Sequence, residues 1–310
     1  MTGLPGRRVI LAALGSLLLT VCSHAQLAKH VFIVSIDQGA PEDILNSEMP
    51  LLLKMAAEGA HTWEAYTIVP SLTLPSHVSM LTGVGIQKHQ ILWNEFEPQK
   101  GLLKVPTIFR LARDRGLVTA LFAGKSKFHT LRTPRSLDFA VIPEKTTALE
   151  TARLFAAEVS RLKPNLCFIH FADADTAGHK FGVHSPEKLR ALAECDQALK
   201  ILMDAISAAG LTESSVVIVT ADHGGHDRSA EDNARRMKTF QSYQPGTHGT
   251  PQTSDVVIPW IAWGHGVKKN YSITAPVVTY DTAATALWLL GIPLPDDLWG
   301  RPVKSAFENP

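Results

Sequence analysis

The chain has 310 residues, of which 45% are hydrophobic and 19% are charged, and its formal net charge is +1. These values are those of an ordinary globular protein, and the length fits one large α/β domain better than two equal domains. A net charge so close to zero argues against a general nucleic-acid-binding surface or an anionic membrane as a partner. A local phosphate site remains compatible with it, because bound metal ions do not appear in the sequence count.

The first 25 residues have the organisation of an export signal. Arg7 and Arg8 form a positive segment, residues 9–22 form an apolar run, and a small-x-small cleavage site ends at Ala25. The apolar run is too short for a comfortable transmembrane span. We therefore expect a periplasmic or secreted protein without a transmembrane anchor after cleavage. A lipoprotein acylated at Cys22 is the alternative, although the residue before this cysteine fits it poorly.

In chain order, hydrophobic periodicity predicts strands and helices that largely alternate. The expected elements are strand 30–36, helix 49–58, strand 61–69, helix 76–81, helix 105–115, strand 118–122, helix 147–162, strand 166–171, helix 186–209, strand 215–220, strand 256–263 and helix 280–290. Apolar strands that alternate with amphipathic helices imply an α/β fold, with a mostly parallel sheet covered by helices on both faces. The irregular segments 84–104 and 224–253 are the candidate active-site loops.

Two cysteines remain after removal of the export signal. Cys167 lies in an expected buried strand and Cys195 in an expected helix. An oxidising compartment permits them to pair, and two buried free thiols fit the sequence equally well.

Aspartate and histidine residues follow several of the expected strands. Asp37 follows the first strand, Asp175 and His179 follow the fourth, and Asp222 and His223 follow the fifth. Taken singly, each is more often a helix cap, a turn former or a structural histidine. Because parallel strands deliver their carboxyl ends to one edge of the sheet, these groups are expected to converge there. Two compact turns that each hold a carboxylate and an imidazole indicate a site for zinc or a similar ion.

Five short motifs occur in order between residues 30 and 290. They are Asp37 after the first strand, Pro70-Ser-Leu-Thr73-Leu-Pro-Ser-His77 with Leu81-Thr-Gly83, Asp175-x-x-Gly-His179, Asp222-His223-Gly224 and Thr247-His248-Gly249. Together they resemble the type I phosphodiesterase/nucleotide pyrophosphatase family of the alkaline phosphatase superfamily. The resemblance implies one alkaline-phosphatase-like catalytic domain over residues 26–310. The chain is short for this superfamily, so we expect a minimal cap.

The resemblance also implies a site for two divalent metal ions, with zinc as the expected ion and manganese as the alternative. One ion would be bound by Asp175, His179 and His248. The other would be bound by Asp37, Asp222 and His223, with the Thr73 hydroxyl beside it.

Thr73 is the nucleophile that the resemblance implies, and the reaction would pass through a phospho-threonine intermediate. A free threonine hydroxyl is a poor nucleophile, and a neighbouring dication favours its alkoxide. Thr73 also stands near the start of an expected helix, where free N–H groups favour an anion. Asn94 matches the asparagine of the family that donates a hydrogen bond to a phosphoryl oxygen.

The sequence departs from the family pattern at two positions that are not predicted ligands. Ser76 stands where the family commonly has asparagine, and Gln90 where it commonly has glycine. We expect His77 and His89 to be structural, whereas His226 could contact metal or substrate.

The substrate class is less constrained by the sequence than the metal site. Thr73 and Asn94 favour phosphodiester or pyrophosphate cleavage of a small-molecule phosphate ester. Lys125 and Lys127 follow the third strand and resemble a lysine segment of some monoesterases and phosphonoacetate hydrolases of the superfamily, where it contacts the substrate; a solvated loop is the other interpretation. Phosphomonoester or phosphonoacetate-type hydrolysis is therefore the alternative function. A non-catalytic metal-binding protein is disfavoured, because the ligand set is complete. The oligomeric state stays open.

Overall fold

The computed structural model describes residue 2 and residues 26–308. The expected export signal, including Cys22, falls on residues outside this description apart from residue 2, and it stays a prediction. Within the described part of the chain, no helix has the length and apolar character needed to cross a membrane.

An eight-stranded sheet forms the centre of the domain, in the order β10-β2-β9-β6-β1-β5-β3-β4. In this sheet β9 runs antiparallel to both of its neighbours, and the remaining pairs are parallel. The mostly parallel sheet predicted from the sequence is confirmed. The strands are β1 His30–Ile36, β2 Ala60–Tyr66, β3 Thr119–Ala123, β4 Phe139–Val141, β5 Leu166–Phe171, β6 Ser215–Thr220, β9 Val257–Gly264 and β10 Tyr271–Ser272.

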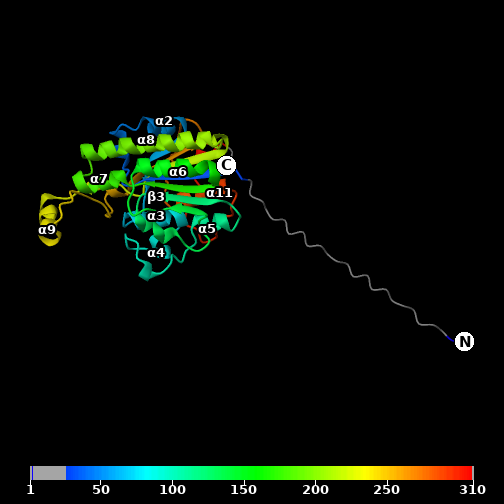
Figure 1. Cartoon of the computed structure of the whole chain (residues 1–310), viewed down its shortest axis with the longest axis horizontal. Helices are drawn as coiled ribbons and strands as arrows, with labels where there is room; N and C mark the ends of the chain where they lie inside the picture. The colour runs from blue at the N-terminus through cyan, green and yellow to red at the C-terminus, as the bar shows by residue number, and fades with distance from the viewer. Residues whose placement is uncertain (1, 3–25, 309–310) are drawn as a thin grey trace.

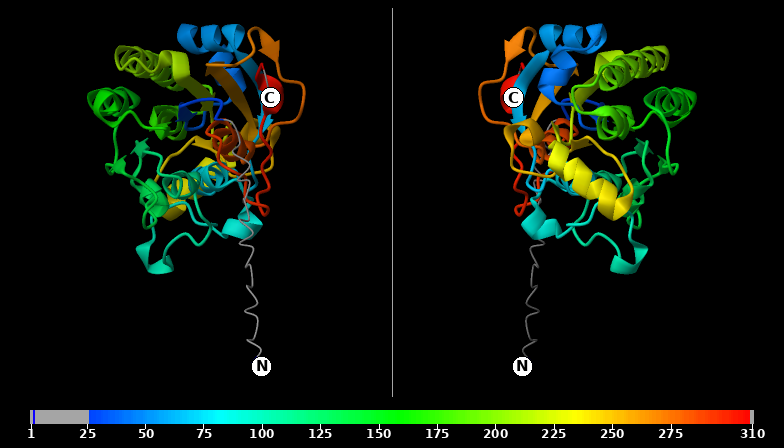
Figure 2. Two further views of the ribbon diagram at one scale, coloured as in Figure 1. Left: turned by 90° about the vertical axis from the view of Figure 1, so that its right-hand side faces the viewer. Right: turned by 90° about the vertical axis from the view of Figure 1, so that its left-hand side faces the viewer.

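Helices cover both faces of this sheet (Figures 1 and 2). Alternate residues of β1 point to opposite faces, so Val31 and Ile33 join one apolar core and Phe32 and Val34 join the other. The first core includes side chains of α3 (Thr73–Thr82), α5 (Ile108–Arg113) and α11 (Asp281–Leu289); the second includes those of α2 (Pro50–Glu58), α6 (Ala148–Leu162) and α8 (Pro186–Ala208).

The shorter elements lie in the connections. They are α1 Pro41–Leu45, α4 Ile86–His89, α7 Asp173–Phe181, α9 Ala230–Phe240, α10 Thr253–Val256, the two-residue strands β7 His226–Asp227 and β8 Gly246–Thr247, and the 3-10 turns Pro98–Lys100, Ser126–Leu131, Thr212–Ser214 and Lys304–Ala306.

Three local predictions differ from the structure. The helix expected at 76–81 begins at Thr73, because Pro75 lies in its first turn, where a missing N–H is tolerated. The compact turn expected from Asp175 to His179 is part of helix α7. The expected loop 224–253 contains helix α9, of which Asn233 is the one buried residue. Its apolar residues Ala230, Ala234, Met237 and Phe240 recur at helical spacing, but they are few in a strongly polar segment, and Met237 and Phe240 are exposed. The polar composition of the segment therefore favours a loop in the sequence.

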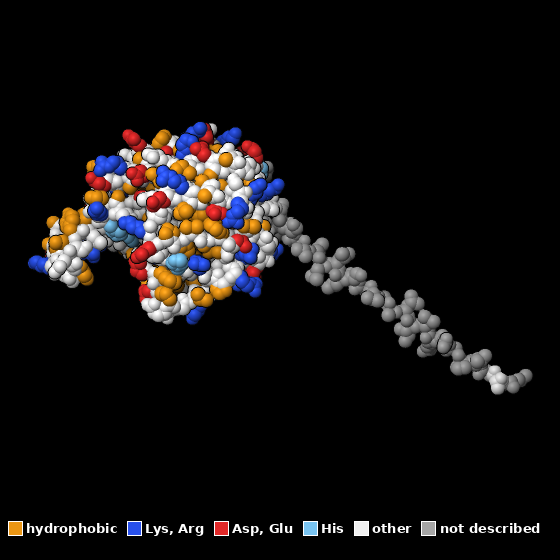
Figure 3. Space-filling model, viewed as in Figure 1, with side chains coloured by type: hydrophobic (Ala, Val, Ile, Leu, Met, Phe, Trp, Pro, Cys, Tyr) orange, Lys and Arg blue, Asp and Glu red, His pale blue; other side chains and the backbone are white. Residues whose placement is uncertain are grey.

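Helix α9 projects from the body beside α7, between the β7 and β8 strands that form its base (Figures 1 and 2). In the space-filling view, this projection is separated from the body by a notch, and histidine side chains are visible near its base (Figure 3). The segment 226–247 is thus a small excursion between two of the family motifs.

The two cysteines are buried free thiols. Cys167 on β5 and Cys195 on α8 belong to the same apolar core, and burial raises the pKa of both thiols. Of the two interpretations left open by the sequence, the structure has the unpaired thiols.

Candidate active site

Five of the six predicted metal ligands come from the carboxyl ends of parallel strands of the central sheet. Asp37 directly follows β1, and Asp222 and His223 directly follow β6. Strand β5 leads into α7, which carries Asp175 and His179. His248 follows β8. Because parallel strands end at one edge of the sheet, residues more than a hundred positions apart meet there.

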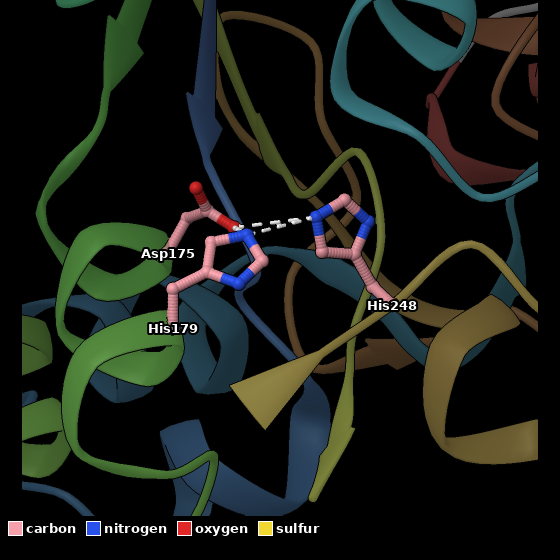
Figure 4. Close-up of side chains that lie close together, drawn as sticks. All are labelled: Asp175, His179 and His248. Carbon is pink, nitrogen blue, oxygen red and sulfur yellow. Dashed lines mark hydrogen bonds and ion pairs between the residues drawn. The ribbon is translucent and has the colours of Figure 1, made fainter. Parts of the chain in front are cut away.

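The first cluster consists of Asp175, His179 and His248 (Figure 4). The Nε2 atoms of His179 and His248 lie 3.3 Å and 3.6 Å from Asp175 Oδ1 and 3.2 Å from each other. Asp175 and His179 are one helical turn apart, so α7 presents them on the same face. The Nδ1 atom of His179 donates to the Gly246 carbonyl and that of His248 to the Ser71 carbonyl. Both Nε2 lone pairs are therefore free for a metal.

The second cluster is centred on His223 Nε2. Thr73 Oγ1 lies 3.2 Å from this nitrogen, Asp222 Oδ2 lies 3.3 Å from it, and Asp37 Oδ1 lies 3.4 Å from it. His223 Nδ1 donates to the Gly224 carbonyl, so Nε2 carries no hydrogen and its lone pair is available to a metal ion. Ligand atoms of Asp37, Asp175 and His223 also lie within 4.8 Å of one another, so the two clusters adjoin.

Three buried carboxylate oxygens in these clusters have no hydrogen-bond partner among the residues that the structure describes: Asp37 Oδ1, Asp175 Oδ1 and Asp222 Oδ2. Each is the oxygen that faces a histidine Nε2. A buried unpaired carboxylate oxygen is costly unless a cation compensates it. A tetrahedral ion with ligand distances of about 2.0–2.1 Å needs ligand–ligand separations of roughly 3.3–3.4 Å, close to those observed. The separations between histidine nitrogens and carboxylate oxygens therefore fit divalent metal ions in chemistry and in spacing. The second group of ligand atoms that lie close enough for one ion contains Asp37, His223 and Asp175, whereas Asp222, among the predicted ligands, approaches only His223.

The charges of the site also favour cations. Burial alone would raise the pKa of the Asp37 carboxyl, but Lys125 and His170 outweigh it and hold this pKa well below its usual range. Burial and the neighbouring carboxylate of Asp37 raise the pKa of Asp222 well above its usual range. Burial lowers the pKa of His223 well below its usual range, which favours the neutral imidazole that metal ions bind. The site thus contains more carboxylate charge than its protein cations balance.

A cavity of about 360 Å³ opens over the first cluster, whose three residues line it together with Thr73, Asn94, Lys125 and Lys127. Thr73 is the first residue of α3. The side-chain carbonyl of Asn94 accepts a hydrogen bond from the Leu74 N–H at 2.8 Å. This contact uses the amide oxygen and leaves the amide N–H groups available as donors. Asn94 is therefore fixed beside the start of the helix, next to the proposed nucleophile.

The two predicted lysines have different surroundings, and neither lies in a solvated loop. Lys125 Nζ is 2.6 Å from Asp37 Oδ2 and 2.5 Å from Asp175 Oδ2, contacts that the sequence did not predict. Burial lowers the pKa of Lys125, but these two carboxylates outweigh it and the net shift is upward. Lys127 is 8% exposed, and its nearest carboxylate is Glu95 at 3.6 Å. Burial lowers the pKa of Lys127.

His170 is a contact residue of the site that sequence reasoning missed. It lies fully buried on β5, its Nδ1 accepts from the Gly124 N–H, and its Nε2 donates to Asp37 Oδ2 at 2.9 Å. The available signal was a histidine inside an otherwise apolar strand. That signal does not identify a partner 133 positions away along the chain.

Three other histidines singled out in the sequence are not predicted ligands, although His77 Nδ1 lies 3.4 Å from Asp222 Oδ2 of the second cluster. His77 donates to the Thr73 carbonyl and accepts from the Ser35 hydroxyl, and His89 contacts the Ser79 hydroxyl, as expected of structural residues. His226 pairs with the buried Asp255 at 2.7 Å. Gln90, which replaces a family glycine, has a φ of 61°, the left-handed conformation that favours glycine.

Comparison with known proteins agrees with these motifs. The family model of type I phosphodiesterase/nucleotide pyrophosphatase matches residues 31–258. Ectonucleotide pyrophosphatase/phosphodiesterase family member 7 of Rattus norvegicus is 25% identical over 202 residues, which are 57% of this chain and 45% of that protein. A bis(5'-adenosyl)-triphosphatase of Bos taurus is 24% identical over 246 residues, which are 70% of this chain and 52% of that protein. The chain thus spans about half the length of these curated relatives.

Solved structures share the fold at lower sequence identity. Murine ectonucleotide pyrophosphatase/phosphodiesterase 5, as an inactive threonine-to-alanine variant in complex with AMP, superimposes with a TM-score of 0.76 at 14% identity. The human protein gives a TM-score of 0.74 at 16% identity. Both matches cover 90% of this chain and 100% of the other chain. Because the family model covers most of the chain, we conclude that this protein belongs to the type I phosphodiesterase/nucleotide pyrophosphatase family.

Proposed function

We propose that this chain hydrolyses phosphodiester or pyrophosphate bonds of small phosphate esters, with Thr73 as the nucleophile and two divalent ions in the adjoining clusters. The observation that carries the proposal is the position of Thr73 Oγ1. It lies 3.2 Å from His223 Nε2, in the cluster where Asp37 and Asp222 present unpaired buried oxygens. A hydroxyl at the first residue of a helix, among metal-binding atoms, is well placed to act on a phosphate.

The ligand sets are those implied by the motifs. Asp175, His179 and His248 would hold one ion, and Asp37, Asp222 and His223 would hold the other. Mixed carboxylate and imidazole donors with nearly tetrahedral spacing favour zinc, with manganese as the alternative. When bound, the ions would supply Lewis acidity to the attacking and leaving oxygens.

The protein's own groups would do the positioning. The hydroxyl of Thr73 would attack phosphorus in line with the leaving oxygen, forming a phospho-threonine that water then hydrolyses. The first turn of α3 favours the phosphate charge through its N–H groups and its dipole. Asn94, fixed by its hydrogen bond from the Leu74 N–H, would donate its amide hydrogen to a phosphoryl oxygen.

The relatives support a nucleotide-like substrate. One is named as a bis(5'-adenosyl)-triphosphatase, and another was solved with AMP and is inactive as a threonine-to-alanine variant.

A second function, hydrolysis of phosphomonoesters or of phosphonoacetate-type substrates, is favoured by one observation. Lys127 lies buried in the cavity wall with its nearest carboxylate 3.6 Å away, so its charge could balance a substrate dianion. We also propose that the protein is exported, to the periplasm or outside the cell, and acts on small molecules.

The test combines metal analysis with one substitution. Purified protein should contain close to two equivalents of metal, and Thr73→Ala should abolish turnover with nearly unchanged metal content. Retained activity in this variant would mean that water attacks directly or that another residue is the nucleophile. Protein that neither contains metal nor responds to added zinc or manganese would refute the two-metal proposal. The ratio of rates on an aryl phosphate and its bis-aryl diester then decides between the two substrate classes.

A further inference from the structure

Lys125 connects the two metal-ligand clusters. It lies just beyond β3, and its Nζ donates to Asp37 Oδ2 at 2.6 Å and to Asp175 Oδ2 at 2.5 Å. Asp37 belongs to the cluster around His223, whereas Asp175 belongs to the cluster with His179 and His248. The lysine side chain is 17% exposed, so this double contact is largely shielded from water.

The lysine uses a different oxygen of each aspartate from the one that faces the histidines. Asp37 Oδ1 faces His223 Nε2 at 3.4 Å, and Asp175 Oδ1 faces His179 Nε2 at 3.3 Å. Both Oδ1 atoms are buried and have no hydrogen-bond partner within residues 26–308. A lysine held on Oδ2 therefore leaves Oδ1 of each carboxylate as the available metal ligand. This geometry favours coordination of a metal ion through one oxygen of each aspartate rather than through both oxygens.

The charge balance of the site changes when metal binds. Without metal, the carboxylates of Asp37, Asp175 and Asp222 are buried close together. In the described part of the chain, Lys125 is the one lysine or arginine that forms an ion pair with any of them. Removing one partner of a buried ion pair leaves uncompensated charge, which is strongly destabilising. Bound dications would take over this compensation, so the lysine should matter most in the metal-free protein.

We propose that Lys125 is an internal counter-ion that keeps the two ligand clusters assembled in the absence of metal and orients Oδ1 of Asp37 and Asp175 toward the metal positions. The inference rests on the proposed two-metal function. It assigns Lys125 a positioning role in place of the substrate contact suggested by its sequence motif.

The test compares melting temperatures with and without metal. Lys125→Met keeps the length of the side chain and removes its charge. We expect it to lower the Tm of the chelator-treated protein by roughly 5–10 °C, and that of the zinc-loaded protein by less than half as much. Lys125→Arg, which retains the charge, should lie closer to the wild type in chelator. Lys127→Met is the matched control, because it removes a nearby charge that touches no predicted ligand; its effect should be equal in both states.

Several results would overturn the proposal. Equal losses of Tm with and without zinc would make Lys125 an ordinary structural residue. A Lys125→Met protein that cannot fold even when prepared with zinc would mean that metal does not replace the lysine charge. Zinc binding by the wild type is measured in parallel by elemental analysis. A wild type that binds no zinc overturns both this inference and the proposed function, whereas zinc binding with equal losses overturns this inference alone.

Discussion

The contact between His170 and Asp37 allows a quantitative test of how the second cluster is held. His170 Nε2 donates to Asp37 Oδ2 at 2.9 Å, and the ring is fixed by the Gly124 N–H. Replacing His170 by leucine removes a hydrogen bond to a charged group, worth about 1.5–3 kcal/mol. At about 1.4 kcal/mol for each factor of ten, zinc affinity at this cluster should fall roughly 10- to 100-fold. Because Lys125 still donates to Asp37 Oδ2 in this variant, we expect the loss of zinc affinity to lie in the lower half of that range.

The assay is a competition titration of zinc against a chromophoric chelator, on wild type and variants. His170→Gln should recover part of the affinity, because its carboxamide can still donate to Asp37. His30→Leu is the matched control, since His30 is a buried histidine at the other end of β1 whose Nδ1 donates to the Pro164 carbonyl. An unchanged affinity in His170→Leu, or an equal loss in His30→Leu, would refute the reasoning.

Three further predictions concern the cavity and the core. Asn94→Ala should lower kcat roughly 10²- to 10³-fold while metal content stays constant, measured by steady-state kinetics with elemental analysis; a change in KM alone would contradict the donor role. Lys127→Ala should slow hydrolysis of an aryl phosphate more than that of a bis-aryl diester, and equal losses would remove Lys127 from the substrate. Burial lowers the pKa of His89 to about 4, so acidification destabilises the fold between pH 6.5 and pH 4, where the unfolded chain binds the proton first. The pH dependence of unfolding free energy should differ between wild type and His89→Gln by roughly 2 kcal/mol from pH 7 to pH 5, and parallel profiles would be the contrary result.

The sequence by itself was enough for six of the eight strands and for the main helices, but not for the edge strands β4 and β10, which are three and two residues long. It also supplied the candidate ligands, which stay a prediction. Apolar strands such as His30–Ile36 are buried on both faces, so their hydrophobic runs are continuous and their bounds are readable. The ligands Asp37, Asp222 and His223 lie directly after such strands, and parallel topology then brings them to one edge. Family motifs supplied the pairing of residues into two clusters, which strand order alone does not determine.

Other features were decided only by the tertiary structure. Helix α9 is strongly polar, and its larger apolar side chains, Met237 and Phe240, are exposed, so the helix is visible only in the fold. Cys167 and Cys195 lie in one apolar core and are unpaired. The contacts of Lys125 with Asp37 and Asp175 join residues 88 and 50 positions apart. A local sequence pattern constrains neighbours along the chain, whereas such ion pairs depend on where separate strands end in space. For that reason the sequence could point to a lysine near the substrate, and only the fold could show which carboxylates it contacts.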